Sequence, residues 1–459
     1  MNDKVYLIIG MARSGVAAAK LLADRGVTVR VNDMKTREAL GEALKPLEGL
    51  SHIEWHLGEA PETLLHGVGT MVISPGIPYE ADIVQTALRQ GIEVIGEIEL
   101  SARLNKGRLI AITGTNGKTT TTTLTGEIFK SAGFTTHVVG NIGYPFAAVA
   151  GTAGPDDVVV CEVSSFQLES VKTFRPSVAC VTNVREDHLN RHHTMAVYAA
   201  MKARIFENQT PDDALVLNAA DAYAPAFAEA SKGQVVWFSS QGKVPRGAYA
   251  DGGLIYYESG HGRQTICRCD ELLIPGQHNL ENALCAVAIT MSAGVPAEAA
   301  ARALRSFKGI EHRMELVRVL DGVRYIDDTE GTNADSTVQA VRAMTEDTVL
   351  ILGGSIKDND YSGLCRDIAT CGHIAHVVLI GQTAEQFDAA LKKAGYDTAR
   401  IHHLGRDFKG AIETARTLAD RHGAVLLSPA CASFDMFHNA DERGDIFKDI
   451  VNHMTPSEA

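Results

Sequence analysis

A glycine-rich segment between a predicted strand and a predicted helix has the residue types of a phosphate-binding loop. The segment "ITGTNGKTTTTTLTGEIF" (112–129) runs from an apolar stretch through two glycines into a run of threonines. Backbone N–H groups in such a turn, together with the positive end of the helix, bind phosphate oxygens. Lys118 would contact the β- and γ-phosphates of a nucleotide, and the Thr119 hydroxyl would bind Mg²⁺. The usual pattern has a glycine where Ile112 stands, but strand, turn and helix follow in the expected order, which predicts a nucleotide site.

Polar residues also follow two other predicted strands. Glu162 ends the apolar stretch in "CEVSSFQLE", and Asp187 and His188 come after the next one, in "TNVREDHLNRH". Sheets of α/β proteins bind ligands at the carboxyl ends of their strands, and Mg²⁺ prefers oxygen ligands. Glu162 with Thr119 is therefore a sensible first magnesium site, although a single glutamate there is often a helix cap or an ion-pair partner.

Other candidate residues have ordinary structural explanations. Lys202 lies in the amphipathic stretch "VYAAMKARIFE", where a lysine is usually a solvated surface cation. Asn279 and Asn282 are three positions apart on one helical face, which suits either a base or ribose of a nucleotide or a helix cap. Arg313 and Asp328 begin the last third of the chain, and each is a weak signal by itself.

The composition excludes several classes of partner. The 459 residues carry a net charge of −13, with 45% hydrophobic and 22% charged residues, as in ordinary globular proteins. Without a basic run, neither nucleic acid nor an anionic membrane surface is an expected partner. No apolar window reaches the ~18 residues of a membrane span, and the N-terminus does not match a signal peptide. The eight scattered cysteines fit reduced thiols, so we expect a cytoplasmic protein without membrane insertion.

Three stretches of alternating apolar runs and helical patterns must position these residues. They predict an α/β fold with three domains and parallel sheets in each. The expected domains are a Rossmann-like N-terminal domain (1–96), a central P-loop ATPase-like domain (97–309) and a Rossmann-like C-terminal α/β domain (310–459).

Seven motifs occur in a fixed order along almost the whole chain: "GTNGKTT", "EVSSFQLE", "NVREDH", "GQHNLENA", "HR", "DDTEGTN" and "SPACASFDMF". This set closely resembles the Mur ligase family of peptidoglycan synthesis, and "SSFQLE" with "SPACASFDMF" resembles the branch that adds D-glutamate. The resemblance implies one domain for a UDP substrate, one for ATP, and one for ADP and the amino acid. It implies an ATP- and Mg²⁺-dependent ligase that joins D-glutamate to UDP-N-acetylmuramoyl-L-alanine. We expect this ligase to be a monomer. The carboxylate of the UDP substrate would attack the γ-phosphate to give an acyl phosphate, which the D-glutamate amine then attacks.

The resemblance also assigns roles to individual residues. The resemblance implies that Lys118, His188 and Lys202 are catalytic residues. It implies that the metal ligands are Thr119, Glu162, His188 and Lys202, the last as a carbamate. It implies that ATP contacts Gly114, Thr115, Asn116, Gly117, Lys118, Thr119, Thr120, Asn279, Asn282, Arg313 and Asp328. It implies that the UDP substrate contacts Arg13, Ser14, Gly15, Asp33, Ser74, Pro75, Gly76, Asn141 and Ser164. It implies that the amino acid contacts Thr332, Lys357, Ser433 and Phe434.

Two positions depart from the family pattern. Many relatives have a lysine where this chain has Glu330, and an aromatic residue where it has Ala440. Both positions lie near the amino-acid pocket in the family. They therefore put the details of D-glutamate binding in question, but not the class of reaction.

Three alternative functions make different predictions. The first is another ligase of the superfamily. The ligases that add diaminopimelate or lysine carry an Asn-Pro-Arg signature, which this chain lacks. Folylpolyglutamate synthase has a similar phosphate loop but lacks "SSFQLE" with "SPACAS". A dehydrogenase would bind nicotinamide without turning over ATP, although Ala12 in "GMARSG" replaces the middle glycine of the dinucleotide fingerprint. A nucleotide-binding switch would bind ATP but release no phosphate in the presence of substrate.

Overall fold

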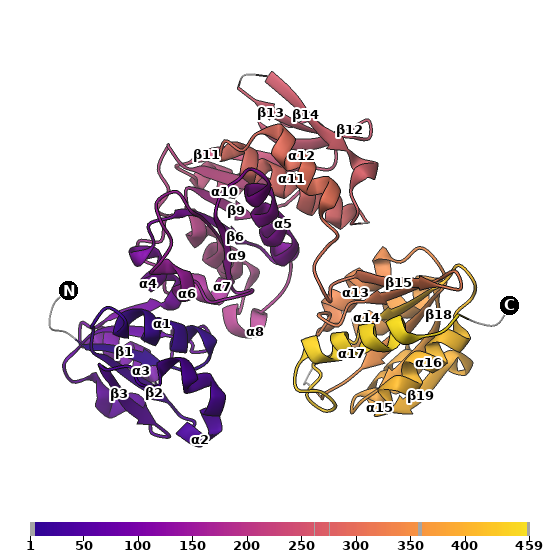
Figure 1. Ribbon diagram of the computed structural model, residues 1–459, viewed down its shortest axis with the longest axis horizontal. Coiled ribbons are helices and arrows are strands. Elements are labelled where there is room, and N and C mark those ends of the chain that lie inside the picture. The colour runs from indigo at the N-terminus through magenta and orange to yellow at the C-terminus, as the bar shows by residue number, and fades with distance from the viewer. Residues whose placement is uncertain (1–4, 261, 275, 357–359, 457–459) are drawn as a thin grey trace. The chain divides into compact units, whose positions relative to one another are not determined.

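The computed structural model describes residues 5–260, 262–274, 276–356 and 360–456. The chain forms two compact units, Met1–Phe307 and Lys308–Ala459. The first contains two β-sheets and the second contains one (Figure 1). Within the described ranges, no helix has the length and apolar character needed to cross a membrane.

The N-terminal sheet is fully parallel, with strand order β3-β2-β1-β4-β5. Its strands are β1 (Val5–Ile9), β2 (Val29–Asp33), β3 (Ile53–Leu57), β4 (Val68–Ile73) and β5 (Glu93–Gly96). Its helices are α1 (Arg13–Ala23), α2 (Arg37–Leu40), η1 (Gly41–Leu47), η2 (Pro61–Leu65) and α3 (Asp82–Arg89). Ile8 packs into one apolar cluster, while Leu7 and Ile9 pack into another on the opposite face. This is the pattern of a buried parallel strand covered on both sides.

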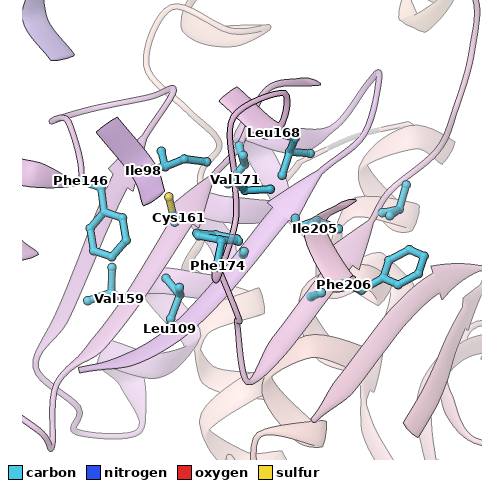
Figure 2. Close-up of a cluster of buried hydrophobic side chains, with 14 of the residues drawn as sticks. Ile98, Leu109, Phe146, Val159, Cys161, Leu168, Val171, Phe174, Ile205 and Phe206 are labelled. Atoms are coloured by element: carbon cyan, nitrogen blue, oxygen red, sulfur yellow. The ribbon is translucent and has the colours of Figure 1, made fainter. Parts of the chain in front are cut away.

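The central sheet has the order β14-β13-β12-β11-β10-β9-β6-β8-β7. Its strands are β6 (Arg108–Thr113), β7 (Thr136–Gly140), β8 (Val158–Glu162), β9 (Val178–Val181), β10 (Ala214–Asn218), β11 (Gln234–Ser239), β12 (Gly247–Asp251), β13 (Leu254–Ser259) and β14 (Gly262–Arg268). Its helices are α4 (Glu97–Leu104), α5 (Lys118–Ser131), α6 (Ala147–Ala150), α7 (Ser165–Leu168), α8 (Leu189–His192), α9 (Met195–Ala203), η3 (Arg204–Phe206), α10 (Ala224–Ala230), η4 (Cys269–Glu271), α11 (Gln277–Ser292) and α12 (Ala297–Ser306). Figure 2 shows part of one apolar cluster of this unit, with Phe146, Cys161 and Phe174 among its members.

The C-terminal sheet has the order β15-β16-β20-β17-β18-β19. Its strands are β15 (Glu315–Leu320), β16 (Val323–Asp327), β17 (Thr348–Gly353), β18 (Ile374–Ile380), β19 (Ile401–Gly405) and β20 (Ala424–Leu427). Its helices are α13 (Ala334–Ala343), α14 (Ser362–Thr370), α15 (Ala384–Lys393), η5 (Thr398–Arg400), α16 (Phe408–Leu418) and α17 (Ala440–His453). Together the three sheets confirm the predicted three-domain α/β fold, while the boundaries at residues 96 and 309 stay predictions.

Three antiparallel pairs among the described strands, β12–β13, β13–β14 and β15–β16, correct the expectation that the sheets are parallel throughout. Two of them have a tight two-residue turn within the described residues. β12 pairs antiparallel with β13 across Gly252 and Gly253, whose φ angles are 54° and 79°. β15 pairs antiparallel with β16 across Asp321 and Gly322, with φ angles of 54° and 85°. Two positive φ angles define a type I′ turn, for which Asp-Gly and Gly-Gly are preferred. Both dipeptides are present in the sequence. They are signals of hairpin turns, which the apolar patterns of the strands alone did not reveal.

Candidate active site

The predicted phosphate loop joins β6 to α5, and two of its positions accept only glycine. Gly114 has a φ of +148°, and a Cβ there would lie 1.9 Å from Thr182 Oγ1. Gly117 has a φ of +76°, and a Cβ there would lie 2.3 Å from Asn282 Oδ1. The left-handed backbone and the close neighbours both exclude a side chain. The loop therefore turns directly into the N-terminus of α5, where Lys118, Thr119 and Thr120 form the first turn.

The segment after β9 holds this loop in place. Asn183 accepts the Thr115 N–H through its carbonyl oxygen and the Asn116 N–H through Oδ1, both at 2.9 Å. Thr182 Oγ1 donates to the Asn116 carbonyl at 2.7 Å. Thr182 and Asn183 belong to the same motif as His188, "TNVREDHLNRH", but no residue pattern singled them out. Their role is visible only once β9 lies beside β6 in the sheet.

Helix α11 brings its two asparagines to the same place. Thr121 Oγ1 lies 3.4 Å from Asn282 Oδ1, and Asn282 Nδ2 donates to Asn279 Oδ1 at 3.2 Å. Asn282 also lies against Gly117, as the close approach above requires. Both predicted nucleotide-binding asparagines therefore stand beside the phosphate loop.

Two lysines, one on α5 and one on α9, donate to the backbone of the loop. Lys118 Nζ lies 2.8 Å from the Thr115 carbonyl oxygen, and Lys202 Nζ lies 2.6 Å from that of Gly114. Lys202 is not in the solvated environment that is usual for a lysine on such a helix, because only 1% of this residue is exposed. It lies on the buried face of α9, where its Nζ is 4.4 Å from the centre of the Tyr198 ring. Burial, and then repulsion by Lys118, hold the pKa of the Lys202 amine well below its ordinary value.

Glu162 ends β8 as predicted and is 1% exposed. Its Oε1 accepts a hydrogen bond from Asn141 Nδ2 at 2.8 Å, whereas its Oε2 is buried with no partner among the described residues. An unpartnered buried carboxylate oxygen is costly unless a cation or a donor meets it. The position therefore fits a divalent metal, for which carboxylate oxygens are suitable ligands.

His188 is more exposed and sits at the N-terminus of α8 with a φ of +53°. Its ring centre is 4.8 Å from that of Phe166, and its Nε2 is 3.3 Å from Asp187 Oδ2. Burial lowers the pKa of His188, Asp187 raises it, and the two lysines lower it further, with a net decrease. A neutral imidazole has a nitrogen lone pair available for a metal.

Most of the residues expected to bind the UDP substrate lie at the carboxyl ends of β1, β2 and β4, whereas Asn141 follows β7 and Ser164 follows β8. The turn of Gly10 is closed by Ser74 Oγ, which donates to its carbonyl at 2.9 Å. Asp33 Oδ2 accepts the Met11 N–H at 2.7 Å. Ser14 and Gly15 lie in the first turn of α1, and Pro75 and Gly76 follow Ser74 after β4.

Arg13 and Ser164, like Asp33 and Ser74, also have partners within the protein. The Arg13 guanidinium donates to the Gly143 carbonyl, which lies in the same loop as Asn141. Ser164 caps α7, since its Oγ accepts the Gln167 N–H at 3.3 Å. Contact of these two side chains with substrate stays a prediction.

In the second unit, the residues predicted to bind nucleotide lie around the end of β16. Asp328 accepts hydrogen bonds from Ser428 Oγ at 2.6 Å and from the Met314 N–H at 3.2 Å. Burial raises the pKa of the Asp328 carboxyl to about 7, while Ser428 and the nearby Arg313 act in the opposite direction. Arg313 Nε is buried without a partner in the described part of the chain. Such a donor is available for a ligand.

The candidate amino-acid residues follow β16 and β20. Ser433 is 1% exposed, and its Oγ has no partner among the residues that the structure describes, whereas Phe434 is 74% exposed. Thr332 lies in the turn after Asp328, and its N–H donates to the Glu330 carbonyl at 2.8 Å. Lys357 lies outside the described residues.

Arg443 on α17 connects the segments that follow β16 and β20. From the sequence, no role was predicted for this arginine. It is completely buried, and it donates from Nε to Thr329 Oγ1 at 2.7 Å and from Nη2 to the Cys431 carbonyl at 3.2 Å. Burial lowers the pKa of its guanidinium to about 10. Its Nη1 has no partner within the described ranges. An arginine on the polar side of a helix is usually solvated, so only the packing of α17 on the sheet reveals this role.

We expect the stability of the second unit to depend on pH through His312. His312 Nδ1 lies 2.7 Å from Asp327 Oδ2, and this hydrogen bond raises the pKa of His312 although burial opposes it. Because the pKa is higher in the folded protein, the stabilisation is complete below the unfolded pKa of about 6.5 and is lost as pH rises through the folded pKa. Calorimetric melting of the full chain should show that His312→Gln lowers the melting temperature by about 2–4 °C at pH 6.

This difference between wild type and His312→Gln should shrink by pH 9. Exposed His438, which pairs with Glu442 on the surface, provides a matched control, and His438→Gln should leave the melting temperature nearly unchanged. A difference for His312→Gln that grows with pH would contradict the assignment.

Comparison with known proteins decides the family. Three family models match successive parts of the chain: "Mur ligase MurD-like, N-terminal domain" at residues 4–96, "Mur ligase middle domain" at 112–290, and "Mur ligase, glutamate ligase domain" at 312–431. The chain belongs to the Mur ligase family. The three family models follow one another along the chain in the same order as the three sheets.

Several Mur ligases are similar to this chain over nearly their whole length. A protein of Pelotomaculum thermopropionicum named UDP-N-acetylmuramoylalanine--D-glutamate ligase is 44% identical over 98% of this chain and 97% of its own. A protein of the same name from Caldanaerobacter subterraneus is 41% identical over 98% of each chain. Among solved Mur ligase structures, UDP-N-acetylmuramate-alanine ligase of Thermotoga maritima matches with a TM-score of 0.60 at 17% identity, covering 98% of this chain and 99% of that one. At this identity, the structural match supports the fold alone.

Proposed function

We propose that this protein is an ATP-dependent ligase that joins D-glutamate to UDP-N-acetylmuramoyl-L-alanine during the synthesis of peptidoglycan precursors. The observation that carries the proposal is the full-length similarity, at 44% identity, to a ligase named for this reaction. The arrangement of the phosphate loop fits it, since two lysines converge on the loop from different helices. A Mur ligase of Thermotoga maritima with a TM-score of 0.56 was solved in complex with ADP.

The chain's own residues account for activation of the carboxylate. The N–H groups of the phosphate loop and the N-terminus of α5 bind the phosphates of ATP, and Lys118 places a positive charge beside the γ-phosphate. A carboxylate oxygen of the L-alanyl group attacks the γ-phosphorus, the bond from phosphorus to the bridging oxygen breaks, and ADP leaves. The amine of D-glutamate then attacks the acyl carbon, loses a proton, and releases inorganic phosphate as the amide forms. Lys118 contributes most where charge develops on the transferring group.

Thr119, Glu162, His188 and Lys202 are the residues that would hold Mg²⁺. The orphaned Oε2 of Glu162 and the lowered pKa of His188 favour this assignment. Bound Mg²⁺ would supply positive charge to the transferring phosphoryl group. Lys202 fits this set only as a carbamate, in which the amine has gained CO₂ and carries a carboxylate-like group.

We propose that the amino acid is D-glutamate despite Glu330. The unpartnered Ser433 Oγ and Arg443 Nη1 are buried donors that suit carboxylate groups. Glu330 is only partly buried, and its charge acts on Arg443, so part of its repulsion toward an anionic substrate is already offset. Two anions about 6 Å apart repel by roughly 3 kcal/mol at an effective dielectric of about 20, which a solvated loop reduces. Glu330 therefore points away from the substrate or is balanced by Arg443.

A panel of amino acids tests this proposal. Phosphate release with ATP, UDP-N-acetylmuramoyl-L-alanine and each amino acid should be fastest with D-glutamate, and Glu330→Ala should change its KM by only a few-fold. Thr332→Ala should raise the same KM at least tenfold, because it removes a predicted contact. A preference for a cationic or neutral amino acid would overturn the substrate assignment, and phosphate release without any amino acid would overturn ligation.

A further inference from the structure

Two buried glutamates anchor the start of α4, but they differ in how well they are satisfied. Glu99 accepts hydrogen bonds from the Lys172 and Phe174 N–H groups at 3.0 and 2.9 Å, and from Thr173 and Arg103 as well. Burial raises its pKa, but these donors outweigh burial and the pKa is lowered. Glu99 therefore has the full set of partners expected of a buried carboxylate.

Glu97, two positions before Glu99 in the same helix, has fewer partners. It is 3% exposed, and its Oε1 accepts the Ala147 N–H at 2.5 Å and the Ser101 hydroxyl at 3.1 Å. Its Oε2 is buried without a partner in the part of the chain that the structure describes. Burial raises the pKa of this carboxyl to about 7, and the two hydrogen bonds only partly oppose that effect. Burying a carboxyl group with one unpartnered oxygen is costly, so the hydrogen bonds of Oε1 only partly offset the burial of Glu97.

The partner of Glu97 lies at the end of the segment 141–146, which we call the substrate loop. At its start, the Asn141 N–H donates to the Glu162 carbonyl at 2.9 Å, and the Gly140 N–H donates to the Tyr144 carbonyl at 2.9 Å. The loop also carries Asn141, whose side chain meets Glu162, and Gly143, whose carbonyl meets Arg13. The bond from Ala147 to Glu97 fixes the opposite end of this loop.

The residues around the bond between Glu97 and Ala147 are buried as well. Phe146 is completely buried, and Ala147 is 3% exposed. Figure 2 shows Ile98 and Phe146, the neighbours of the two bonded residues, in the same apolar cluster as Cys161. A cavity of about 10 Å³, lined by Ser74, Glu97 and Phe166 among others, lies beside them. It has room for about one water molecule and joins the turn of Ser74 to the same glutamate.

We propose that Glu97 is a positioning residue for the UDP substrate, because its carboxyl fixes the substrate loop and borders the turn of Ser74. This inference rests on the proposed function for the identity of the substrate. If Glu97 loses its acceptor, the Ala147 N–H is left buried and unpaired, and the substrate loop must move to satisfy it. Asn141 and Gly143 would move with the loop, while the phosphate loop would keep its own supports at Thr182 and Asn183.

Calorimetric titration of two substitutions of similar size tests this role. Glu97→Gln keeps an acceptor for Ala147, so the Kd of UDP-N-acetylmuramoyl-L-alanine should stay within about threefold of wild type. Glu97→Met removes the acceptor and should raise this Kd about tenfold or more, the effect expected of an unpaired buried N–H. The Kd of a non-hydrolysable ATP analogue should change less than twofold in both variants.

Glu99→Gln is the matched control for a purely structural role. It should lower the melting temperature without changing the Kd of the UDP substrate, because Glu99 holds residues 172–174 rather than the substrate loop. An unchanged Kd in Glu97→Met, or an equal rise in Glu99→Gln, would overturn the proposal. If Glu97→Met does not fold, Glu97→Asp replaces it, because the shorter side chain keeps the charge but cannot reach Ala147. A wild-type Kd of the UDP substrate in Glu97→Asp would then overturn the proposal. Wild-type enzyme that binds the UDP substrate but releases no phosphate with D-glutamate would reject the proposed function and leave this test intact.

Discussion

Lys118→Ala should lower kcat for ligation about a thousandfold, a loss of roughly 4 kcal/mol of transition-state stabilisation. Lys118 begins α5, and its Nζ donates to the Thr115 carbonyl, so its charge lies at the loop that we propose binds the phosphates of ATP. An interaction that is stronger in the transition state than in the ground state lowers kcat when it is removed. Steady-state phosphate release at saturating ATP measures this effect.

Lys130→Ala is a suitable control for Lys118→Ala. Lys130 lies in the last turn of the same helix, is exposed, and pairs with Glu127 at 2.8 Å. An exposed pair of this kind contributes little to stability, so this variant should keep the wild-type kcat. Near-normal turnover by Lys118→Ala, with the same melting temperature as Lys130→Ala, would reject the role of Lys118.

Lys202→Ala should be almost inactive and should recover partial activity in a short-chain carboxylate such as propionate. Carbamylation joins the uncharged amine to CO₂ and releases a proton, so it requires a lysine that is deprotonated near neutral pH. Burial and Lys118 lower the pKa of Lys202 in the required direction. A carbamate would also change the repulsion between the two lysines into attraction. Added propionate supplies the missing negative group, whereas chloride should not.

The controls separate a carbamate from a simple cation. Lys202→Arg keeps a positive charge but cannot form the carbamate, and it should be as inactive as Lys202→Ala. Propionate should not restore Lys118→Ala. In ¹³C-labelled bicarbonate, wild-type protein should show a carbamate resonance that Lys202→Ala lacks. High activity of Lys202→Arg, or the absence of that resonance from fully active wild-type protein, would contradict this assignment.

The strands and helices that carry the site could be predicted from the sequence, whereas the environment of each side chain could be predicted less well. The strand, turn and helix around Lys118 follow from local residue types, because a glycine-rich turn before a helix has few other conformations. Glu162 was placed correctly at a strand end because the apolar run before it predicts a buried strand. Lys202 could not be recognised from helical spacing, since its burial depends on α9 packing beneath the phosphate loop. The resemblance to a family, rather than the pattern of α9, identified it.

Contacts between segments distant in the sequence stayed hidden. Thr182, Asn183 and Arg443 support predicted sites through bonds to residues 66 to 114 positions away. Glu97 is a similar case, because its partner Ala147 is 50 positions further along the chain. No local pattern predicts such pairs, because they follow from strand order and helix packing. The two hairpins are different, since Gly252-Gly253 and Asp321-Gly322 are turn signals that could have been recognised.

Isotope transfer from the UDP substrate to phosphate tests the central claim most directly. UDP-N-acetylmuramoyl-L-alanine labelled with ¹⁸O in its carboxylate is incubated with ATP, Mg²⁺ and D-glutamate, and the phosphate released is analysed by mass spectrometry. If ATP activates this carboxylate, each phosphate carries one ¹⁸O, and phosphate and amide product form in equal amounts. Unlabelled phosphate, or phosphate release that does not depend on the UDP substrate, would contradict the account.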